Sequence, residues 1–350
     1  MKVAIATESW PPYATDTSFY RHTRDVLAAV RLAGLDAYPL ALSSNRGAKV
    51  GGLVRPYLRR HLGGYAEAGA GDLVHHVTQE SRRGVDVVTV HDTYAFHDTR
   101  FSDRFFRDAV RLAIRRAKRV VFTTQWSLEE AARRPEFAGM REKFRVVPVP
   151  HRTPPAGRSE GPARFDAVWI GRNSPNKNLP LYLALAVRHP AHRFAVRSSK
   201  SPDREALDRE VAWKLAAAQN VASLPRLSDD EMDALYRSTP VLVVTSNFEG
   251  FHDPAMEAYV RGAKVVLPRI EPYLELYRGG DAANTYWYEP EWVERPFAWD
   301  FGRSLERLSA AFGEAHAARA GLPDARVVRA VSLEAVGEGL RAVYEEVGGG

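Results

Sequence analysis

The sequence predicts an α/β protein built from two consecutive Rossmann-like domains that face each other across a cleft. Short apolar runs, typical of buried strands, alternate with longer segments of helical periodicity. Such alternation indicates parallel sheets with right-handed crossovers. The alternation stops at residues 153–163, which are rich in proline and glycine, and then begins again. The length of 350 residues also favours two domains over one.

The first half opens with the apolar and β-branched run KVAIAT, which predicts a buried strand at residues 2–7. A helix is expected over residues 18–32, because Val26, Leu27 and Val30 follow helical spacing and Gly34 can cap its end. The same reasoning predicts the remaining elements of this half. They are strands at 37–42, 73–77, 85–90, 120–123 and 146–149, and helices at 105–118 and from about residue 127.

The second half repeats this organisation. Its strands are expected at 165–170, 193–196, 221–224, 241–245 and 264–267, and its helices at 179–187, 204–218, 229–236, 254–261, 301–318 and 333–347. The carboxyl ends of parallel strands are where open α/β sheets bind ligands. We therefore expect the functional residues in the loops that follow the strands.

Composition excludes several classes of protein. Hydrophobic residues make up 45% and charged residues 26%, which is typical of a globular chain rather than a disordered one. No apolar run approaches the roughly 18 residues of a membrane span, so we expect neither secretion nor a spanning helix but a cytoplasmic protein. The absence of cysteine excludes disulfides and thiolate metal sites. Together with few side-chain amides, it also favours a thermophilic source.

The net charge of +6 fits an anionic small ligand as well as nucleic acid. No nucleic-acid-binding module accompanies the charge, so we do not expect a nucleic-acid partner. Only eight residues are lysine. A lysine inside a polar motif is therefore noteworthy.

The most specific motif is EGFHDPAME at residues 249–257, between a predicted strand and a helix that begins near Pro254. A helix N-terminus offers unpaired N–H groups and suits an anion. Gly250 permits close approach of a ligand to the backbone. Glu257, one turn into the helix, can accept hydrogen bonds from a vicinal diol such as ribose. Taken alone, Glu249 and Glu257 could equally be solvated charges.

A second motif, GRNSPNKN at residues 171–178, directly follows the strand FDAVWI. It holds Arg172 and one of the rare lysines, Lys177. Two cations at a strand-to-helix turn suit a diphosphate, with Arg172 as a forked donor and Lys177 as a point charge. A solvated loop is the alternative.

The order and spacing of the two motifs resemble those of the retaining group-one glycosyltransferases, which have the two-domain GT-B fold. In that family a strand ends in Gly-Arg, a lysine follows about five residues later, and a Glu-Gly-Phe-Gly-x-Pro-x-x-Glu motif comes further on. The resemblance covers about residues 165–270 and includes the segments at 228–236 and 258–266. The matching positions are Gly171, Arg172, Lys177, Glu249, Gly250, Phe251, Pro254 and Glu257.

The resemblance implies a donor site in the C-terminal domain, with a UDP-, GDP- or ADP-sugar as substrate. Arg172 and Lys177 would hold its diphosphate and Glu257 its ribose, while Glu249 and the following backbone N–H groups would contact the sugar and phosphate. Glycosyl transfer leaves negative charge on the departing diphosphate. Cations and a helix N-terminus can stabilise that charge without a metal ion, so we expect no cofactor and no metal ligand.

The resemblance also implies the domain plan and the reaction. It predicts an acceptor-side domain at 1–152, a linker at 153–163, a donor domain at 164–325, and a C-terminal helix in 326–350 that crosses back to the first domain. The reaction would move a hexose to a hydroxyl of a carbohydrate, lipid-linked or other acceptor with retention at the anomeric carbon. No nucleophile is assigned.

In the first domain, His91 follows a predicted strand and matches the family's histidine near the donor sugar, which makes it a candidate catalytic residue. A hydrogen-bonded core histidine is the first alternative. The second is a metal site, although the spacing fits no zinc signature. Its ligands would come from His75, His76, His91, Asp92, His97 and Asp98.

The chain departs from the family in three places. The glycine pair expected near residues 13–18 is replaced by a sequence with Thr17 and Ser18, whose hydroxyls could substitute in phosphate binding. His252 and Asp253 replace a glycine and an aliphatic residue, so a side chain at 252 would narrow the sugar pocket or add a polar contact. Arg197 lies where a glycine-rich turn is usual, and we expect it to assist with the diphosphate or the base.

Two basic amphipathic stretches, residues 53–62 and 104–119, could dock on an anionic membrane surface. This would place the protein peripherally at the inner membrane face, although a helix packed on the sheet is the simpler interpretation. Two other functions remain open: a non-catalytic nucleotide-sugar-binding or scaffold protein, which the missing glycine pair favours, and a sugar-nucleotide epimerase, which the paired glutamates disfavour.

Overall fold

The computed structural model describes residues 1–7, 18–41, 69, 71–79, 84–97, 101–153, 163–199, 218–280, 282–291 and 301–349. The chain forms two compact units. The first contains Met1–Arg152 together with Arg329–Gly350, and the second contains Thr153–Val328. The predicted segments 13–17, 53–62 and 204–217, most of the predicted linker, and Asp98 lie outside the described residues.

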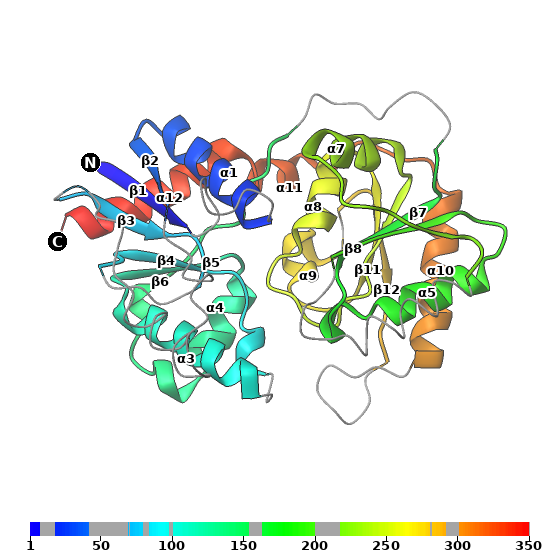
Figure 1. The fold of residues 1–350 in the computed structure, drawn as a ribbon, viewed down its shortest axis with the longest axis horizontal. Coiled ribbons are helices and arrows are strands. Elements are labelled where there is room, and N and C mark those ends of the chain that lie inside the picture. Colours follow the sequence, from blue (N-terminus) through cyan, green and yellow to red (C-terminus); the bar gives the residue numbers. More distant parts are fainter. Residues whose placement is uncertain are drawn as a thin grey trace, which may run out of the picture. The chain divides into compact units, whose positions relative to one another are not determined.

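The first unit contains a six-stranded parallel sheet. Apolar runs form its strands because residues on both faces are covered by helices. Figure 1 shows α1 and α12 over one face and α3 and α4 over the other. The sheet order is β2 (Asp36–Ala41), β1 (Lys2–Thr7), β3 (Leu73–His76), β4 (Val87–Val90), β5 (Arg119–Phe122) and β6 (Phe144–Val146), and the helices are α1 (Ser18–Leu32), α3 (Phe101–Arg116), α4 (Gln125–Ala132) and α12 (Leu333–Gly348).

The last helix, α12, belongs to this unit and packs on α1. Val26 and Val30 of α1 share one buried cluster with Leu340 and Tyr344 of α12. The two backbones approach so closely that a Cβ atom on Gly337 would lie 2.2 Å from the carbonyl oxygen of Ala29. Glycine is therefore required at position 337 for this contact.

The second unit contains another six-stranded parallel sheet. Leu179–Arg188 (α5) and Phe301–Ala317 (α10) pack their apolar residues on one face, and α7, α8 and α9 lie over the other (Figure 1). The sheet order is β12 (Thr285–Tyr288), β11 (Lys264–Pro268), β10 (Val241–Val243), β7 (Ala167–Arg172), β8 (Phe194–Ser199) and β9 (Val221–Ser223). The other helices are α7 (Asp229–Ser238), α8 (Asp253–Val260), α9 (Tyr273–Leu276) and α11 (Ala325–Ala330). The chain passes back to the first unit within α11.

The α/β prediction with two parallel sheets is confirmed. Two details of it are wrong. The strand expected at 146–149 lies at Phe144–Val146, because the apolar run continues past the end of the sheet. The strand β12, with the sequence TYWY, was not predicted, because its aromatic residues lack the continuous aliphatic pattern used to recognise the other buried strands.

Candidate functional site at the carboxyl ends of β7 and β10

The strand order of the second sheet reverses between β7 and β10. These are the first and fourth strands of the unit, and they pair in parallel. Chain connections leave such a pair in opposite directions, and open α/β sheets bind ligands outside the carboxyl ends of such strands. Arg172 is the last residue of β7, and the Glu249 motif begins six residues after β10 ends at Val243. Both motifs singled out in the sequence therefore meet at this switch point.

The loop after β7 is fixed by its own residues. Pro175 begins a short 3₁₀ turn at Pro175–Lys177, and Asn178 adopts a left-handed conformation with φ 47° before α5 begins. Asparagine is one of the few residues other than glycine that tolerates this region. Arg172 is exposed at the start of this loop, and Lys177 is partly buried at its end.

Three hydrogen bonds join this loop to the loop after β10. The Thr245 hydroxyl donates to the carbonyl oxygen of Lys177 at 2.9 Å. The backbone N–H of Asn247 donates to the carbonyl of Asn176 at 2.8 Å, and the Asn176 side-chain amide donates to the carbonyl of Phe248 at 3.2 Å. Two loops distant in sequence thus form one structural unit. The first sequence motif contained Asn176 and Lys177, but their contacts with the segment 245–248 were not predicted.

Lys177 and Glu249 form an ion pair across the two loops. Their side chains are only 18% and 9% exposed, respectively. A buried charge is costly unless it is paired, so each residue holds the other at the switch point. The prediction had placed the two residues in one site without foreseeing that they bind each other.

His252 caps the N-terminus of α8. Its backbone is left-handed, with φ 69°, and its Nδ1 accepts the backbone N–H of Ala255 at 3.2 Å. Burial and, next, the nearby charge of Lys177 hold the pKa of His252 well below its usual value. The neutral ring therefore carries its proton on Nε2, which lies 4.0 Å from a carboxylate oxygen of Glu249.

This geometry explains the glycine of the family motif, since glycine adopts positive φ without steric cost. The side chain at 252 was expected to narrow the sugar pocket or add a polar contact to it; the structure shows in addition that it caps α8. Its neighbours are also internal. Phe251 is buried with 5% exposure, Gly250 is buried, and Asp253 is the first residue of α8.

Glu257 is positioned by a residue that the sequence analysis did not single out for a role. The hydroxyl of Tyr236, on α7, donates to its carboxylate at 2.6 Å. Tyr236 is itself buried, and Arg261 lies 5.5 Å from the centre of its ring. The helix α7 begins with a capping box in which Ser228 and Glu231 satisfy each other's backbone N–H groups. Glu257 is partly exposed.

Arg197 lies on β8, beside β7, at the same sheet edge. Its register partner is Ile170, and the pair Arg172–Ser199 follows two residues later. Arg197 is partly buried. The structure therefore brings Arg172, Lys177, Arg197, Glu249 and Glu257 to the carboxyl edge of one sheet.

Comparison with solved structures decides the fold. Sucrose-phosphate synthase from Thermosynechococcus elongatus matches with a TM-score of 0.68, 14% identity, and coverage of 99% of this chain and 98% of that one. Anabaena HepE in complex with UDP and glucose matches with a TM-score of 0.67, 17% identity and 99% coverage of both chains. The chain has the GT-B glycosyltransferase fold.

Starch synthase IV from Arabidopsis thaliana, bound to ADP and acarbose, is also similar, with a TM-score of 0.64, 12% identity, and coverage of 99% of this chain and 98% of that one. No protein-family model matches the sequence, and no curated protein is detectably similar to it in sequence. At sequence identities of 12–17%, the similarity to these GT-B structures establishes the fold alone.

His91, the candidate catalytic residue of the first GT-B unit, follows β4 directly. Its Nε2 donates to the carbonyl oxygen of Val77, which follows β3, at 2.8 Å, and its backbone N–H donates to the Gln79 side chain at 2.8 Å. The ring stacks edge-on against His22 at 4.7 Å. These contacts are typical of a hydrogen-bonded core histidine. The residue is nevertheless partly exposed.

The alternative metal site in the first unit is not formed by the described residues. His75 bonds to Tyr344 and Thr89 through its two nitrogens, at 2.7 and 2.8 Å. His76 bonds to the carbonyl of Thr78, and His97 pairs with Glu130. In the described part of the chain, one group of histidine and carboxylate side chains meets a metal-ligand geometry, and it lies in the second unit.

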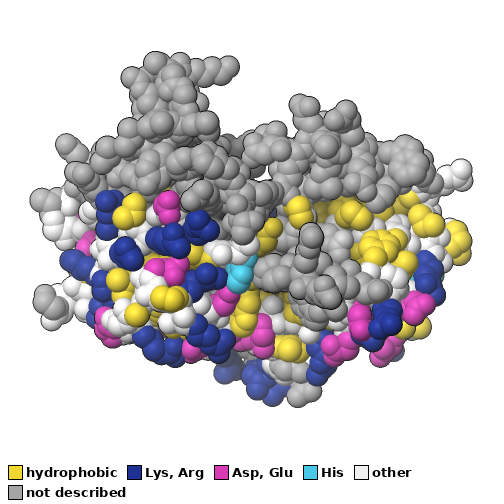
Figure 2. All heavy atoms as spheres, turned by 90° about the horizontal axis from the view of Figure 1, so that it is seen from below, with side chains coloured by type: hydrophobic (Ala, Val, Ile, Leu, Met, Phe, Trp, Pro, Cys, Tyr) yellow, Lys and Arg dark blue, Asp and Glu magenta, His cyan; other side chains and the backbone are white. Residues whose placement is uncertain are grey.

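The basic stretch at 104–119 is largely α3. Its apolar residues Ala109, Val110, Ala113 and Ile114 are buried in the core, as in a helix packed on the sheet. Arg111 pairs with Asp108 and Glu136. On the face drawn in Figure 2, Lys and Arg side chains lie among acidic ones. Within the described segments, no helix combines the length and apolarity needed to cross a bilayer.

Proposed function

We propose that the protein transfers a hexose from a nucleoside diphosphate sugar to a hydroxyl acceptor, with retention at the anomeric carbon and without a metal ion. The observation that carries the proposal is the Lys177–Glu249 pair at the switch point of the second sheet. Glu257 lies one helical turn further along α8. The GT-B fold, and the UDP and ADP bound by HepE and starch synthase IV, support a nucleotide-sugar donor.

In this proposal Arg172 and Lys177 bind the diphosphate. Arg172 is exposed and free to move onto a ligand, and Lys177 is held in place by Glu249. Arrival of a diphosphate gives the ammonium group a second anionic partner. The carboxylate of Glu249 would then turn from the phosphate, which repels it, towards the sugar hydroxyls. Positive charge placed in advance beside the leaving group is the main source of catalysis here.

The N-terminus of α8 contributes fewer N–H donors than the sequence motif suggests. Pro254 has no N–H group, and the N–H of Ala255 is already bound by His252. This leaves more of the diphosphate charge to the side chains of Arg172 and Lys177.

Glu257 would bind the ribose. A carboxylate with two oxygens can accept from both hydroxyls of a vicinal diol. The hydroxyl of Tyr236 fixes its orientation from the side of α7. In the first unit, His91 is proposed to contact the donor sugar; its bond to Val77 uses Nε2, so its Nδ1 is an acceptor in the neutral ring.

The test is a screen of UDP-, GDP- and ADP-sugars that records both thermal stabilisation and release of nucleoside diphosphate. A ligand at 100 times its dissociation constant shifts the unfolding equilibrium about 100-fold. We expect one base to stabilise the protein and its sugar nucleotide to be slowly hydrolysed. Glu249→Gln, which keeps the side-chain size but removes the charge, should slow that release, whereas Lys118→Ala, at an exposed lysine of the first unit, should not.

Three results would contradict the proposal. If no sugar nucleotide binds, the donor site is wrong. If a donor binds but no diphosphate is released with or without acceptors, the protein is a nucleotide-sugar-binding or scaffold protein. If a chelator such as EDTA abolishes turnover and Mg²⁺ or Mn²⁺ restores it, the metal-free mechanism is wrong. The anomeric configuration of the product, read by NMR, tests retention.

A further inference from the structure

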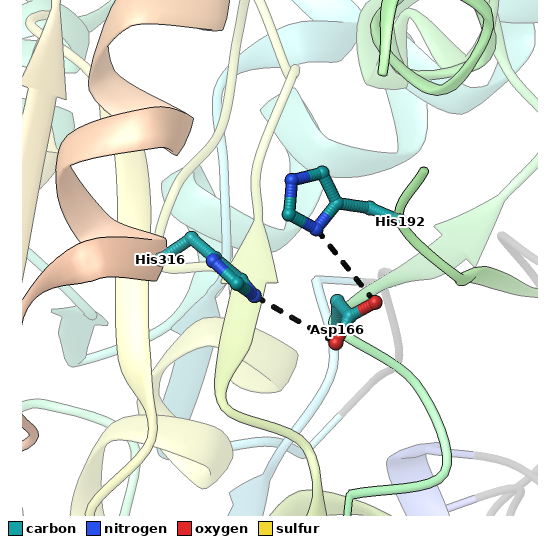
Figure 3. Close-up of side chains that lie close together, drawn as sticks. All are labelled: Asp166, His192 and His316. Carbon is teal, nitrogen blue, oxygen red and sulfur yellow. Dashed lines mark ion pairs between the residues drawn. The ribbon is translucent and has the colours of Figure 1, made fainter. Parts of the chain in front are cut away.

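A second cluster of chemically active side chains lies at the other edge of the second sheet. Asp166 immediately precedes β7, His192 precedes β8, and His316 lies in the last turn of α10. Figure 3 shows both imidazole rings directed at the carboxylate. The β7 strand is six residues long, so the cluster lies about 20 Å from Arg172 at its opposite end. The cluster is therefore separate from the proposed donor site.

The three side chains present their ligand atoms to one point. His192 Nδ1 lies 3.8 Å from one carboxylate oxygen of Asp166, and His316 Nε2 lies 3.7 Å from the other. All three ligand atoms lie within 4.8 Å of one another. The edge of a tetrahedron with bonds of about 2.0 Å is roughly 3.3 Å. Small side-chain rotations would bring the three atoms to this spacing.

The surroundings hold these groups in place. The backbone N–H of Arg193 donates to Asp166 at 2.7 Å and orients the carboxylate. The rings of His192 and His316 both pack on Phe312, at 5.4 and 5.8 Å, and Phe312 is fully buried. Groups that orient ligands in this way are typical of metal sites.

An ordinary ion pair accounts less well for the geometry. Neither imidazole nitrogen is within the roughly 3.2 Å of an N–H···O hydrogen bond to Asp166. The guanidinium of Arg193 is 4.0 Å from the carboxylate and donates instead to the carbonyl of Ala163, at 2.6 Å. A cation among the three side chains would compensate the carboxylate and use both rings.

We propose that Asp166, His192 and His316 bind one transition-metal ion, with Zn²⁺ as the expected occupant. Two imidazole nitrogens and one carboxylate oxygen suit Zn²⁺, whereas Mg²⁺ and Ca²⁺ require oxygen ligands. The side chains are 20–35% exposed, which leaves a fourth position for water. The ion would join the end of α10 to the amino edge of β7 and β8, and so act on stability. This proposal does not depend on the proposed function.

The test is a titration of chelator-treated, full-length protein with Zn²⁺, followed by calorimetry and thermal unfolding. We expect one Zn²⁺ per chain, no binding of Mg²⁺ at this site, and a rise in the unfolding temperature. His192→Ala, His316→Ala and Asp166→Asn should each weaken Zn²⁺ binding at least about 10-fold. The Asn variant keeps an oxygen for the Arg193 N–H, so it separates loss of the ligand from loss of the fold.

His189→Gln is the matched control. His189 is a neighbouring histidine whose Nε2 bonds to the hydroxyl of Ser309 at 2.7 Å rather than to Asp166. It should bind Zn²⁺ as tightly as the wild type. The proposal is overturned if the wild type shows no saturable Zn²⁺ binding, or if the three ligand variants retain the wild-type affinity.

Discussion

In the first unit, the strand ends carry histidines that bond to the protein's own groups, whereas in the second unit they carry charged side chains on two joined loops. His75 bonds to Tyr344 and Thr89, and His91 to the carbonyl of Val77. In the second unit, Lys177 and Glu249 meet at the point where the strand order reverses. Among the described residues, the strand ends of the first unit thus carry hydrogen-bonded histidines, and those of the second unit carry the Lys177–Glu249 ion pair.

This difference shows that the sheet positions the loops, and that the side chains of the loops determine which ligand the sheet edge can bind. Both sheets are parallel and six-stranded, with buried aliphatic strands. Only the second brings two cationic motifs and two glutamates to one edge among the residues described. A diphosphate needs positive charge and hydrogen-bond donors, so the second unit is the one suited to a nucleotide sugar.

The largest expected effect is on turnover. Lys177→Ala should lower kcat about 10²–10³-fold, because it removes a preorganised charge beside the leaving group. The counterpart in the first unit is Lys118→Ala, an exposed lysine paired with Asp86 at 2.9 Å, which should leave kcat within about twofold. Steady-state kinetics with the donor found in the screen measures both. A Lys177→Ala enzyme that keeps half of the wild-type kcat would contradict the expected difference between the two units.

The next effect is on nucleotide affinity. Glu257→Ala should raise the Kd of the nucleotide about 10–100-fold, the equivalent of a hydrogen bond to a charged group. Tyr236→Phe, which removes only the hydroxyl that orients Glu257, should raise it about 3–10-fold. Calorimetry gives both values, and Glu231→Ala on the same helix is the control, since it affects only the helix cap. Unchanged affinity in Glu257→Ala would remove the ribose assignment.

A third effect is the pH dependence of stability in the first unit. Burial lowers the pKa of His75 to about 3 and that of His22 well below its usual value. The folded state therefore favours the neutral form of both histidines. Their contribution to stability is complete above the unfolded pKa of about 6.5 and is lost as pH falls below it, at up to roughly 1.4 kcal/mol per pH unit for each histidine.

His22→Leu tests this assignment. Neither nitrogen of His22 has a hydrogen-bond partner among the described residues, so an apolar side chain should cost little at pH 7. The variant should also lose part of the decline in stability between pH 6.5 and 5. Denaturant unfolding of both proteins at several pH values provides the comparison. An identical pH slope in the two proteins would contradict the assignment.

The smallest effect concerns the cap of α8. His252→Gly relieves the left-handed backbone but loses the side-chain cap, so its free energy of unfolding should change by less than about 1 kcal/mol. His252→Ala keeps the strain and also loses the cap, and should be destabilised by about 1–2 kcal/mol. Thermal unfolding measures the pair. An alanine variant as stable as the wild type would show that the cap does not explain this histidine.

Much of the fold follows from local patterns in the sequence. Runs such as KVAIAT and VVF form buried strands, because strands covered by helices on both faces are short, nearly continuous apolar runs rich in β-branched residues. The strand β12 was not predicted, because its sequence TYWY is aromatic and only its last residue, Tyr288, is buried. The β6 boundary was misplaced because apolar residues continue beyond the strand, where Val147 and Val149 pack in the core.

The candidate site was partly predictable. The residues Arg172, Lys177, Glu249 and Glu257 could be chosen because their order and spacing are recognisable. The contact between Tyr236 and Glu257 could not, because it joins two helices and has no fixed spacing. The Asp166, His192 and His316 cluster was missed for the same reason: its ligands come from three separate segments. Tertiary contacts of this kind leave no local pattern.

The most direct measurement of the central claim is hydrogen exchange with and without the nucleotide selected in the screen. The account predicts new protection in residues 171–178 and 245–258, the two loops joined around Lys177 and Glu249, and in no strand of the first sheet. Saturating nucleotide that leaves both segments unprotected, while it protects strands β3 to β6, would contradict it.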